Sequence, residues 1–242
     1  MKLNCDLGES FGSWTMGLDA QAMPQIDMAN IACGFHAGDP LVMAKTVAMA
    51  KQFNVAVGAH PGYPDLVGFG RRSLNCSRDE IIALVIYQIA ALDGVAKSQG
   101  VKVSYVKPHG ALYNDMMAKL DVRSAIMQAV SDFHGDIKLM LQATPDWQQH
   151  QQEADTFGLS LLFEAFADRC YDDNGSLLSR NKPGAVHDHD KMLAQVVELA
   201  EQGTITTVNG KVLKLRVDSL CVHGDNLTAV NAIGDIRRVI GQ

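Results

Sequence analysis

The sequence lacks the short motifs that mark several common classes of enzyme. It contains no G-x-x-x-x-G-K-[ST] phosphate loop, no G-x-G-x-x-G dinucleotide fingerprint, no H-E-x-x-H helix and no G-x-S-x-G nucleophile elbow. It also lacks any C-x-x-C pair, because its five cysteines are widely spaced. A disulfide framework and a zinc ribbon are therefore not indicated, and we expect reduced thiols in a cytoplasmic protein.

Positive charge and long apolar runs are scarce as well. The formal net charge is -6, the isoelectric point is near 5.7, and no dense run of Lys and Arg occurs, so we expect no nucleic-acid partner. The most apolar segment, Ile81–Leu92, is interrupted by Gln88 and is too short to span a bilayer. Met1 and Lys2 lead directly into a strand pattern, so we expect neither export nor a membrane partner.

The apolar content is high enough for one full core. Hydrophobic residues make up 47% of the 242 residues and charged residues make up 20%. Chains of this length commonly form one barrel domain, so we expect a single domain over residues 1–242.

Short apolar runs alternate with helical patterns along the chain. Strand candidates start near residues 2, 26, 55, 103, 137, 159 and 219, which predicts parallel strands joined by helical crossovers. Residues 204–215, with Asn209-Gly210 in the middle, predict a hairpin with a two-residue turn that decorates this architecture. An open doubly wound sheet is the alternative. Polar clusters follow six of the seven strands instead of gathering at one switch point, which favours a seven-stranded (β/α) barrel.

The stretch from Asn30 to Pro40 is the point around which the site is predicted. An apolar run ends there in a glycine-bearing turn with His36, and Asp39 followed by Pro40 predicts the capped start of a helix. The carboxyl ends of parallel strands share one face of a barrel, so His36 should lie at its mouth.

Five further strand ends carry side chains of the same chemical types. Any one of these groups is more often a helix cap or a satisfied hydrogen-bonding group than a catalyst, but six at one face of one sheet favour a site. The six clusters are Asp6/Glu9, His36/Asp39, His60/Asp65, Lys107/His109, Glu164/Asp168/Arg169 and His223/Asp225.

These residue types leave the chemistry open. Asp and His can hold a divalent metal ion, or they can perform metal-free acid and base chemistry. Glu9, Arg72 and Arg169 also have ordinary structural explanations, as a first-turn carboxylate or as members of solvated ion pairs.

Six ordered motifs resemble those of the LamB/YcsF lactam-utilisation family. The resemblance runs from residue 1 to about residue 240, and the main departure is Cys5, where alanine is usual. The motifs are Asn4–Glu9, Asn30–Asp39, Gly58–Pro61 with Pro64-Asp65 and Phe69–Arg71, Val106–Gly110 with Leu112–Asn114, Glu164–Arg169 and Cys221–Asp225.

The resemblance implies a barrel of the glycoside hydrolase/deacetylase type. It also implies a role in the ATP-dependent opening of 5-oxoproline to L-glutamate, together with subunits B and C and with Mg as the partner ion of ATP. A metal-dependent deacetylase using Asp6, His36 and His60, and a lactam-binding subunit without catalysis, are the two alternatives. A homo-oligomer stays open.

The role of each residue follows as a hypothesis from this chemistry. Lys107, with Arg72 or Arg169, would stabilise oxyanion and phosphate charge, while Asp6 or Glu164 would activate water. The expected catalytic residues are Asp6, Lys107, His109 and Glu164. The expected substrate-binding residues are Glu9, His36, His60, Arg72, Asp168, Arg169, His223 and Asp225.

Overall fold

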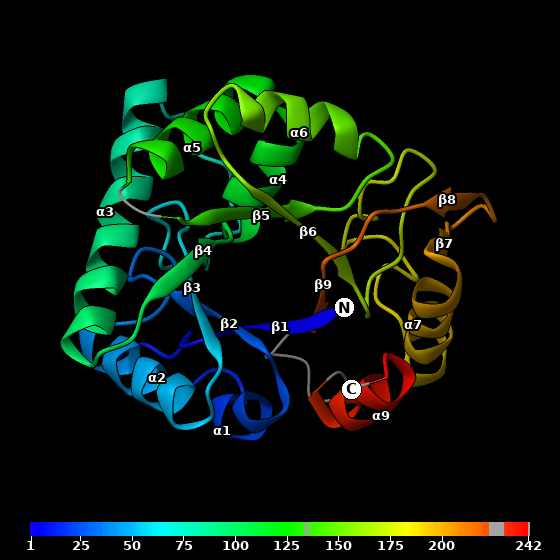
Figure 1. Ribbon diagram of the computed structural model, residues 1–242, viewed down its shortest axis with the longest axis horizontal. Helices are drawn as coiled ribbons and strands as arrows, with labels where there is room; N and C mark the ends of the chain where they lie inside the picture. Colours follow the sequence, from blue (N-terminus) through cyan, green and yellow to red (C-terminus); the bar gives the residue numbers. More distant parts are fainter. Residues whose placement is uncertain (134–135, 223–229, 242) are drawn as a thin grey trace.

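A closed barrel of parallel strands forms the centre of the protein (Figure 1). The structure is a computed structural model that describes residues 1–133, 136–222 and 230–241. Among these residues, the barrel order is β1-β2-β3-β4-β5-β6-β9, and β9 pairs with β1 to close it. The strands are β1 (Lys2–Leu7), β2 (Met28–Ala32), β3 (Ala56–His60), β4 (Val103–Val106), β5 (Lys138–Gln142), β6 (Leu161–Phe166) and β9 (Ser219–Val222). The prediction of a seven-stranded parallel barrel is confirmed, and the open doubly wound alternative is wrong.

Helices surround the barrel on its outside (Figure 1). The long helix α3 packs against α2 and α5 as well as against β3 and β4. The helices are α1 (Asp19–Ala22), the 3₁₀ turn η1 (Met23–Gln25), α2 (Pro40–Gln52), α3 (Arg78–Ser98), α4 (Gly110–Ala118), α5 (Leu120–Asp132), α6 (Trp147–Asp155), α7 (His189–Gln202) and α9 (Ile233–Val239).

Local sequence signals set the ends of the longest helices. The Asp39 carboxylate accepts hydrogen bonds from the N–H groups of Leu41 and Val42, so α2 begins as predicted. Ser77 and Glu80, three positions apart in the sequence, form the capping box of α3. These side chains satisfy backbone donors that have no partner within the helix.

Two local predictions differ from the structure. The sequence Thr144-Pro145 has the pattern of a helix cap followed by a first-turn proline, but α6 begins at Trp147, with Asp146 before it, and Thr144 lines a cavity instead. The strands β7 (Thr204–Thr206) and β8 (Val212–Lys214) are antiparallel as expected. Their turn is longer than the predicted two residues, because the N–H of Thr207 donates to the carbonyl oxygen of Lys211. A two-residue type I′ turn would need two residues with positive φ, and between Thr207 and Lys211 only Gly210 has one.

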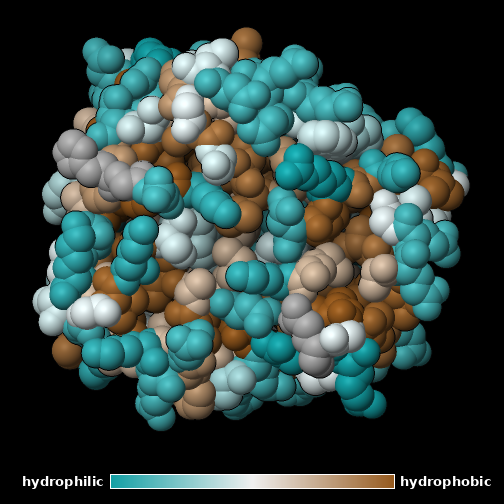
Figure 2. Space-filling view, viewed as in Figure 1, coloured by the Kyte–Doolittle hydropathy of each residue, from teal (hydrophilic) through white to brown (hydrophobic). Residues whose placement is uncertain are grey.

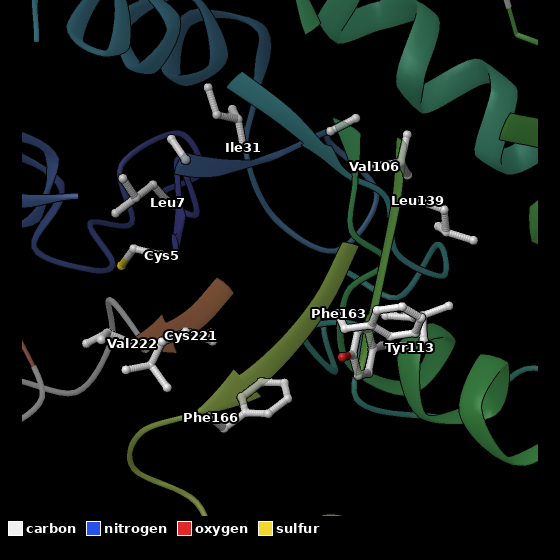
Figure 3. Packing of buried hydrophobic residues seen from close by; sticks show 14 of the residues in the cluster. Cys5, Leu7, Ile31, Val106, Tyr113, Leu139, Phe163, Phe166, Cys221 and Val222 are labelled. Carbon is white, nitrogen blue, oxygen red and sulfur yellow. The ribbon is translucent and has the colours of Figure 1, made fainter. Parts of the chain in front are cut away.

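The apolar core lies between the strands and the helices. Leu7, Ile31, Val106 and Leu139 project from β1, β2, β4 and β5, and all four are fully or almost fully buried (Figure 3). Successive side chains of a strand point to opposite sides, so alternate residues enter the barrel. At one end of the barrel these inward residues are apolar and form a small second cluster of Met28, Tyr105 and Met140.

Tyr105 fits inside the barrel because β3 carries a glycine opposite it. A Cβ atom at Gly58 would overlap the Tyr105 ring, and the β3–β4 register shifts at this point. The Tyr105 hydroxyl donates a hydrogen bond of 2.6 Å to Asn30 Oδ1. Tyr105 thus separates the apolar end of the barrel from a polar region that begins at Asn30.

Helix α3 is longer than the apolar run that the sequence suggested. Its 21 residues are long and apolar enough to cross a membrane by length and composition, and 39% of its most apolar window is buried in the protein. Such a helix is weak evidence for a membrane segment, and here α3 packs within the helical shell. On the face shown in Figure 2, hydrophilic side chains cover most of the rim and hydrophobic atoms show between them.

Candidate active site

Lys107 is the centre of a buried charge cluster at the carboxyl ends of the strands. It follows β4 directly, and its side chain is 3% exposed. Its Nζ atom lies 2.9 Å from Asp6 Oδ1 and 3.1 Å from Glu164 Oε2. The Cys221 Sγ atom lies 3.2 Å from the same nitrogen, and the Phe166 ring lies beside it. Strands β1, β6 and β9 therefore converge on one cation.

Two buried asparagines hold this cluster in place. Asn30 Nδ2 donates to Asp6 Oδ1 at 2.7 Å and to Asn4 Oδ1 at 2.8 Å. Asn4 Nδ2 donates in turn to Ser219 Oγ at 2.7 Å and reaches Glu164 Oε2 at 3.3 Å. These buried hydrogen bonds fix the positions of the charges they join.

Lys107 stays protonated in this environment. Burial lowers the pKa of a lysine, but the charges of its neighbours, chiefly that of Asp6, outweigh burial and raise the pKa of Lys107 well above its usual value. The cluster thus offers a fixed cation beside Asp6, whose side chain is 13% exposed and lines the cavity above it.

Three histidines and Glu9 form a second group next to this cluster. The rings of His36 and His109 are stacked with centroids 3.7 Å apart, and His60 meets both rings edge-on. Glu9 Oε1 lies 3.6 Å from His36 Nε2 and 3.6 Å from His109 Nδ1. All four residues are buried.

Glycines allow this close packing. A Cβ atom at Gly70, where φ is +61°, would lie 2.7 Å from His36 Cβ and 2.8 Å from the His109 ring. A Cβ atom at Gly38 would lie 2.9 Å from the carbonyl oxygen of Gly8, so the loops after β1 and β2 meet only because this residue is glycine. Glu9 and His36 are brought together in this way.

Burial keeps His36 and His109 neutral. It is the main reason why the pKa values of these two residues lie well below the usual value, and the neighbouring histidines lower them further. A neutral imidazole is the form that binds a metal ion.

These four residues could hold a metal ion. One ligand atom from each of Glu9, His36, His60 and His109 lies within 4.8 Å of the other three. Asp6 is not part of this group: its Oδ1 atom faces Lys107, and its Oδ2 atom lies 3.5 Å from His60 Nε2. The structure therefore gathers Glu9 and His109, rather than Asp6, with the metal candidates His36 and His60.

A cavity of about 830 Å³ opens above both groups. Asp6, Glu9, His60, Lys107 and His109 line its base. Its outer walls come from α4, the start of α6 and the loop at residues 174–181. A cavity of this size lies within the usual range for small-molecule sites.

Three arginines line the same cavity. Arg169 is buried and donates to the carbonyl oxygens of Leu178 and Ala185, and it forms no ion pair within the described part of the chain. Burial, and next the charge of Arg180, lower the pKa of Arg169. Arg71 and Arg180 are exposed at the cavity wall. The wall is therefore cationic, although the whole chain is acidic.

Other predicted residues lie elsewhere. Arg72 is 64% exposed and pairs with the buried carboxylate of Asp65, so this pair fastens the loop after β3 and does not line the cavity. Asp168 is buried beside Arg169 and does not line the cavity either. His223 and Asp225 lie outside the described residues.

Several site residues were not assigned a role from the sequence. Asn4 and Asn30 interrupt apolar strands just as Glu164 does, so the same signal could have identified them. Arg71 stands next to Arg72, and nothing in the sequence distinguishes which of the two faces the cavity. Arg180 belongs to an irregular loop whose path the sequence does not predict.

Comparisons with known proteins agree with this architecture. The profile described as the LamB/YcsF family matches residues 1–242. The chain is 54% identical over 241 residues to a protein from Pseudomonas fluorescens (strain Pf0-1) named as the A subunit of 5-oxoprolinase, covering 99% of this chain and 96% of that one. It is 49% identical over 243 residues to a protein of the same name from Vibrio cholerae (strain M66-2), covering 100% and 98%. A solved structure, the lactam utilization protein from Thermus thermophilus, superposes with a TM-score of 0.91 at 36% identity, covering 100% of this chain and 97% of that one.

Proposed function

The chain belongs to the LamB/YcsF family, and from this premise we propose that it is the A subunit of a 5-oxoprolinase. The reaction would open 5-oxoproline to L-glutamate and convert ATP to ADP and phosphate. One observation supports this proposal most strongly. A buried lysine, held between two carboxylates, lies at the base of a cavity whose wall carries further cations.

The chemistry needs both kinds of group. A five-membered lactam is an amide without enough strain to make hydrolysis easy, so ATP would first turn the carbonyl oxygen into a phosphate leaving group. Water would then add to the same carbon, the ring C–N bond would break with the nitrogen leaving as the amine of glutamate, and a second water would release phosphate from the acyl phosphate that remains. Fixed cations stabilise charge that develops on oxygen, and a carboxylate accepts the proton of the water.

Lys107 and Asp6 would perform these two tasks. Lys107 Nζ would donate to the lactam oxygen, since it is a protonated amine at the base of the cavity. Asp6, which also lines the cavity, would act as the general base. Glu164 is fully buried behind Lys107 and does not line the cavity, so it would position the lysine rather than touch the substrate.

The arginines would bind the anionic groups. Arg169 carries a buried charge without an ion pair among the described residues, so a carboxylate of 5-oxoproline would be a favourable partner for it. Arg71 and Arg180 would face the phosphates of ATP from the cavity wall.

The histidine group would complete the base of the site. Glu9, His36, His60 and His109 are the residues that would hold a metal ion, which would supply a Lewis acid for a carbonyl or phosphoryl oxygen. His60 Nε2 lies 3.5 Å from Asp6 Oδ2, so this ring would orient the carboxylate of the base.

Partner proteins would complete the nucleotide site. The relatives are named as one lettered subunit of an enzyme, and this chain carries no phosphate-cradling loop, so we propose that subunits B and C join it to bind ATP with Mg²⁺. Residues 1–242 would act as one barrel-like catalytic domain. The five cysteines are all free thiols, consistent with a cytoplasmic location.

Mixing experiments test this proposal directly. The purified chain with ATP and 5-oxoproline should release no glutamate, and glutamate and ADP should appear in parallel when subunits B and C are added. Parallel release is expected because coupling consumes ATP for each ring opened. Robust hydrolysis by the isolated chain without ATP would contradict the proposal that ring opening is coupled across several proteins.

The Glu9 and histidine group favours a second candidate, a metal-dependent C–N hydrolase related to deacetylases. It would need no nucleotide. The same assay separates the two, because such an enzyme would turn over in the absence of ATP and would lose activity after chelation.

A further inference from the structure

The ring nitrogens of His60 and His109 face each other with their lone pairs. His60 Nδ1 lies 2.7 Å from the carbonyl oxygen of Lys107, and His109 Nε2 lies 2.9 Å from the carbonyl oxygen of Phe69. A carbonyl oxygen only accepts, so both of these nitrogens carry the ring hydrogen. In the neutral rings, His60 Nε2 and His109 Nδ1 are then both bare acceptors, and they are 3.0 Å apart.

Two bare acceptors at this distance repel unless a positive charge lies between or beside them. A shared proton would place a charged imidazolium among buried, stacked rings, away from the water that would solvate it. The neighbouring groups add further acceptors, since the Glu9 carboxylate lies 3.6 Å from His109 Nδ1. Neither ring nitrogen of His36, a fully buried residue, has a hydrogen-bond partner within the described part of the chain. The group therefore gathers acceptor atoms from four residues within 4.8 Å of one another.

The spacing suits a small cation. Tetrahedral ligands at about 2.0–2.1 Å from a zinc ion are roughly 3.3 Å from one another. The distances between neighbouring ligand atoms here are 3.0 Å for His60–His109, 3.6 Å for Glu9–His36 and 3.6 Å for Glu9–His109. The four ligand atoms lie within 4.8 Å of one another, and the stacked rings of His36 and His109 would turn relative to each other to direct both nitrogens at one ion.

The donor set selects the kind of metal. Imidazole nitrogen suits Zn²⁺ and other late transition metals, whereas Mg²⁺ prefers an all-oxygen shell. We propose that Glu9, His36, His60 and His109 hold a resident divalent transition-metal ion, best matched by zinc and separate from the Mg²⁺ of ATP. This site does not depend on the proposed lactam reaction.

The carbonyl partners act as the outer layer of this site. Metal-binding histidines usually donate their second ring N–H to a carbonyl or carboxylate, which fixes the tautomer, and Lys107 O and Phe69 O accept these hydrogen bonds here. Phe69 has a φ of +53°, an unusual value for a bulky side chain. This strained conformation aims its carbonyl at His109, so Phe69 is a positioning residue of the metal site.

Metal binding to the full-length chain tests the proposal. The chain is treated with a chelator, dialysed and titrated with Zn²⁺ or Mg²⁺ in a calorimeter, and the metal content of untreated protein is measured by mass spectrometry. We expect one zinc ion per chain, and an affinity for Zn²⁺ at least about 100-fold above that for Mg²⁺. Substitution by Co²⁺ should give the visible absorption of a four-coordinate site.

Variants locate the ion. His36→Ala and the nearly isosteric Glu9→Gln should each weaken zinc binding by about 100-fold or more, because loss of an outer-layer partner alone costs about 10–100-fold. His189→Ala is the matched control, since His189 lies on α7 outside the group. Circular dichroism confirms that each variant is folded. Binding of fewer than one zinc ion per chain, or equal zinc affinity in Glu9→Gln and His189→Ala, would overturn the proposed metal site. Neither measurement depends on glutamate formation.

Discussion

Lys107 shows how one buried residue is stabilised by what surrounds it. An ammonium group removed from water is costly unless opposite charges and hydrogen bonds replace the lost solvent. Asp6, Glu164 and Asn4 supply these contacts within 3.3 Å of its Nζ atom. A cluster of this kind is weak evidence for added stability, because a well-packed apolar core could be equally stable. Its presence at the base of a cavity is better explained by function.

The pair Asp65–Arg72 gives a pH dependence at the same scale. Hydrogen bonding to Arg72, against the smaller effect of burial, lowers the pKa of Asp65 from 3.8 to about 2. A carboxylate whose pKa is lowered in the folded state contributes its full stabilisation above pH 3.8, its pKa in the unfolded chain. This contribution disappears as the pH falls to about 2, its pKa in the folded protein. Arg72→Gln should therefore be less stable than the wild type at pH 7, and this difference should shrink between pH 3.8 and about 2.

Urea unfolding of both proteins across this range provides the measurement. Arg78→Gln is a suitable control, because Arg78 donates to Ser124 on the protein surface and its effect should not vary with pH. If the difference in unfolding free energy between wild type and Arg72→Gln is the same at pH 7 and at about pH 2.5, this arginine does not lower the pKa of Asp65.

Individual site residues were predictable where one strand end delivers them. Asp6, His60 and Lys107 each come at or directly after a strand, and the shared face of a parallel barrel brings them together. Arg72 was harder to place, because its direction depends on the path of a loop. The turn between Asp65 and Arg72 includes Phe69 and Gly70, both with positive φ, and this turn directs Arg72 back to Asp65.

At the scale of elements, Gly58 and Tyr105 form a pair across β3 and β4. Gly58→Ala should destabilise the protein by about 1–3 kcal/mol, because the added methyl group overlaps a ring that has no room to move. In the double variant Gly58→Ala/Tyr105→Leu, the smaller side chain leaves space. Its loss of stability should be less than the sum of the single losses by roughly 0.5–3 kcal/mol.

Chemical denaturation of the wild type, Gly58→Ala, Tyr105→Leu and the double variant gives the coupling free energy between the two residues. Gly94→Ala in α3 is the control: among the described residues, no atom beyond its own helix backbone lies within 4 Å of the added Cβ, so it should raise stability by about 0.5–1 kcal/mol. Strictly additive effects at Gly58 and Tyr105 would mean that the two residues do not share the space assigned to them.

Elements with local signals were predicted well, and those without them were not. The helices α2 and α3 begin at capping side chains that the sequence displays. Helix α4 begins at Gly110 directly after His109, with no side-chain cap, so no local signal separates it from the site motif. Here tertiary packing, rather than a local signal, determines where the helix starts.

At the scale of the molecule, the barrel divides its interior into two ends. Met28, Tyr105 and Met140 fill one end, while Asp6, His60 and Lys107 occupy the other. Alternation along each strand places these residues inside, which the sequence shows. The closure of β9 on β1 joins residues more than 200 positions apart, so it was inferred from the distribution of polar clusters and not from any local pattern.

The central claim is that the polar end of the barrel opens the lactam. The most direct measurement is glutamate formation from 5-oxoproline and ATP by this chain mixed with subunits B and C, comparing Asp6→Asn with Asp218→Asn. Both changes are nearly isosteric. Asp218 lies just before β9 at the opposite end of the barrel, where its carboxylate accepts a hydrogen bond of 2.9 Å from the N–H of Phe163.

Asp6→Asn should reduce the rate by about 100-fold or more while thermal unfolding shows a folded protein, and Asp218→Asn should stay within about twofold of the wild type. Such a result would place the reaction at the polar end. Wild-type glutamate formation by a folded Asp6→Asn variant would contradict the account.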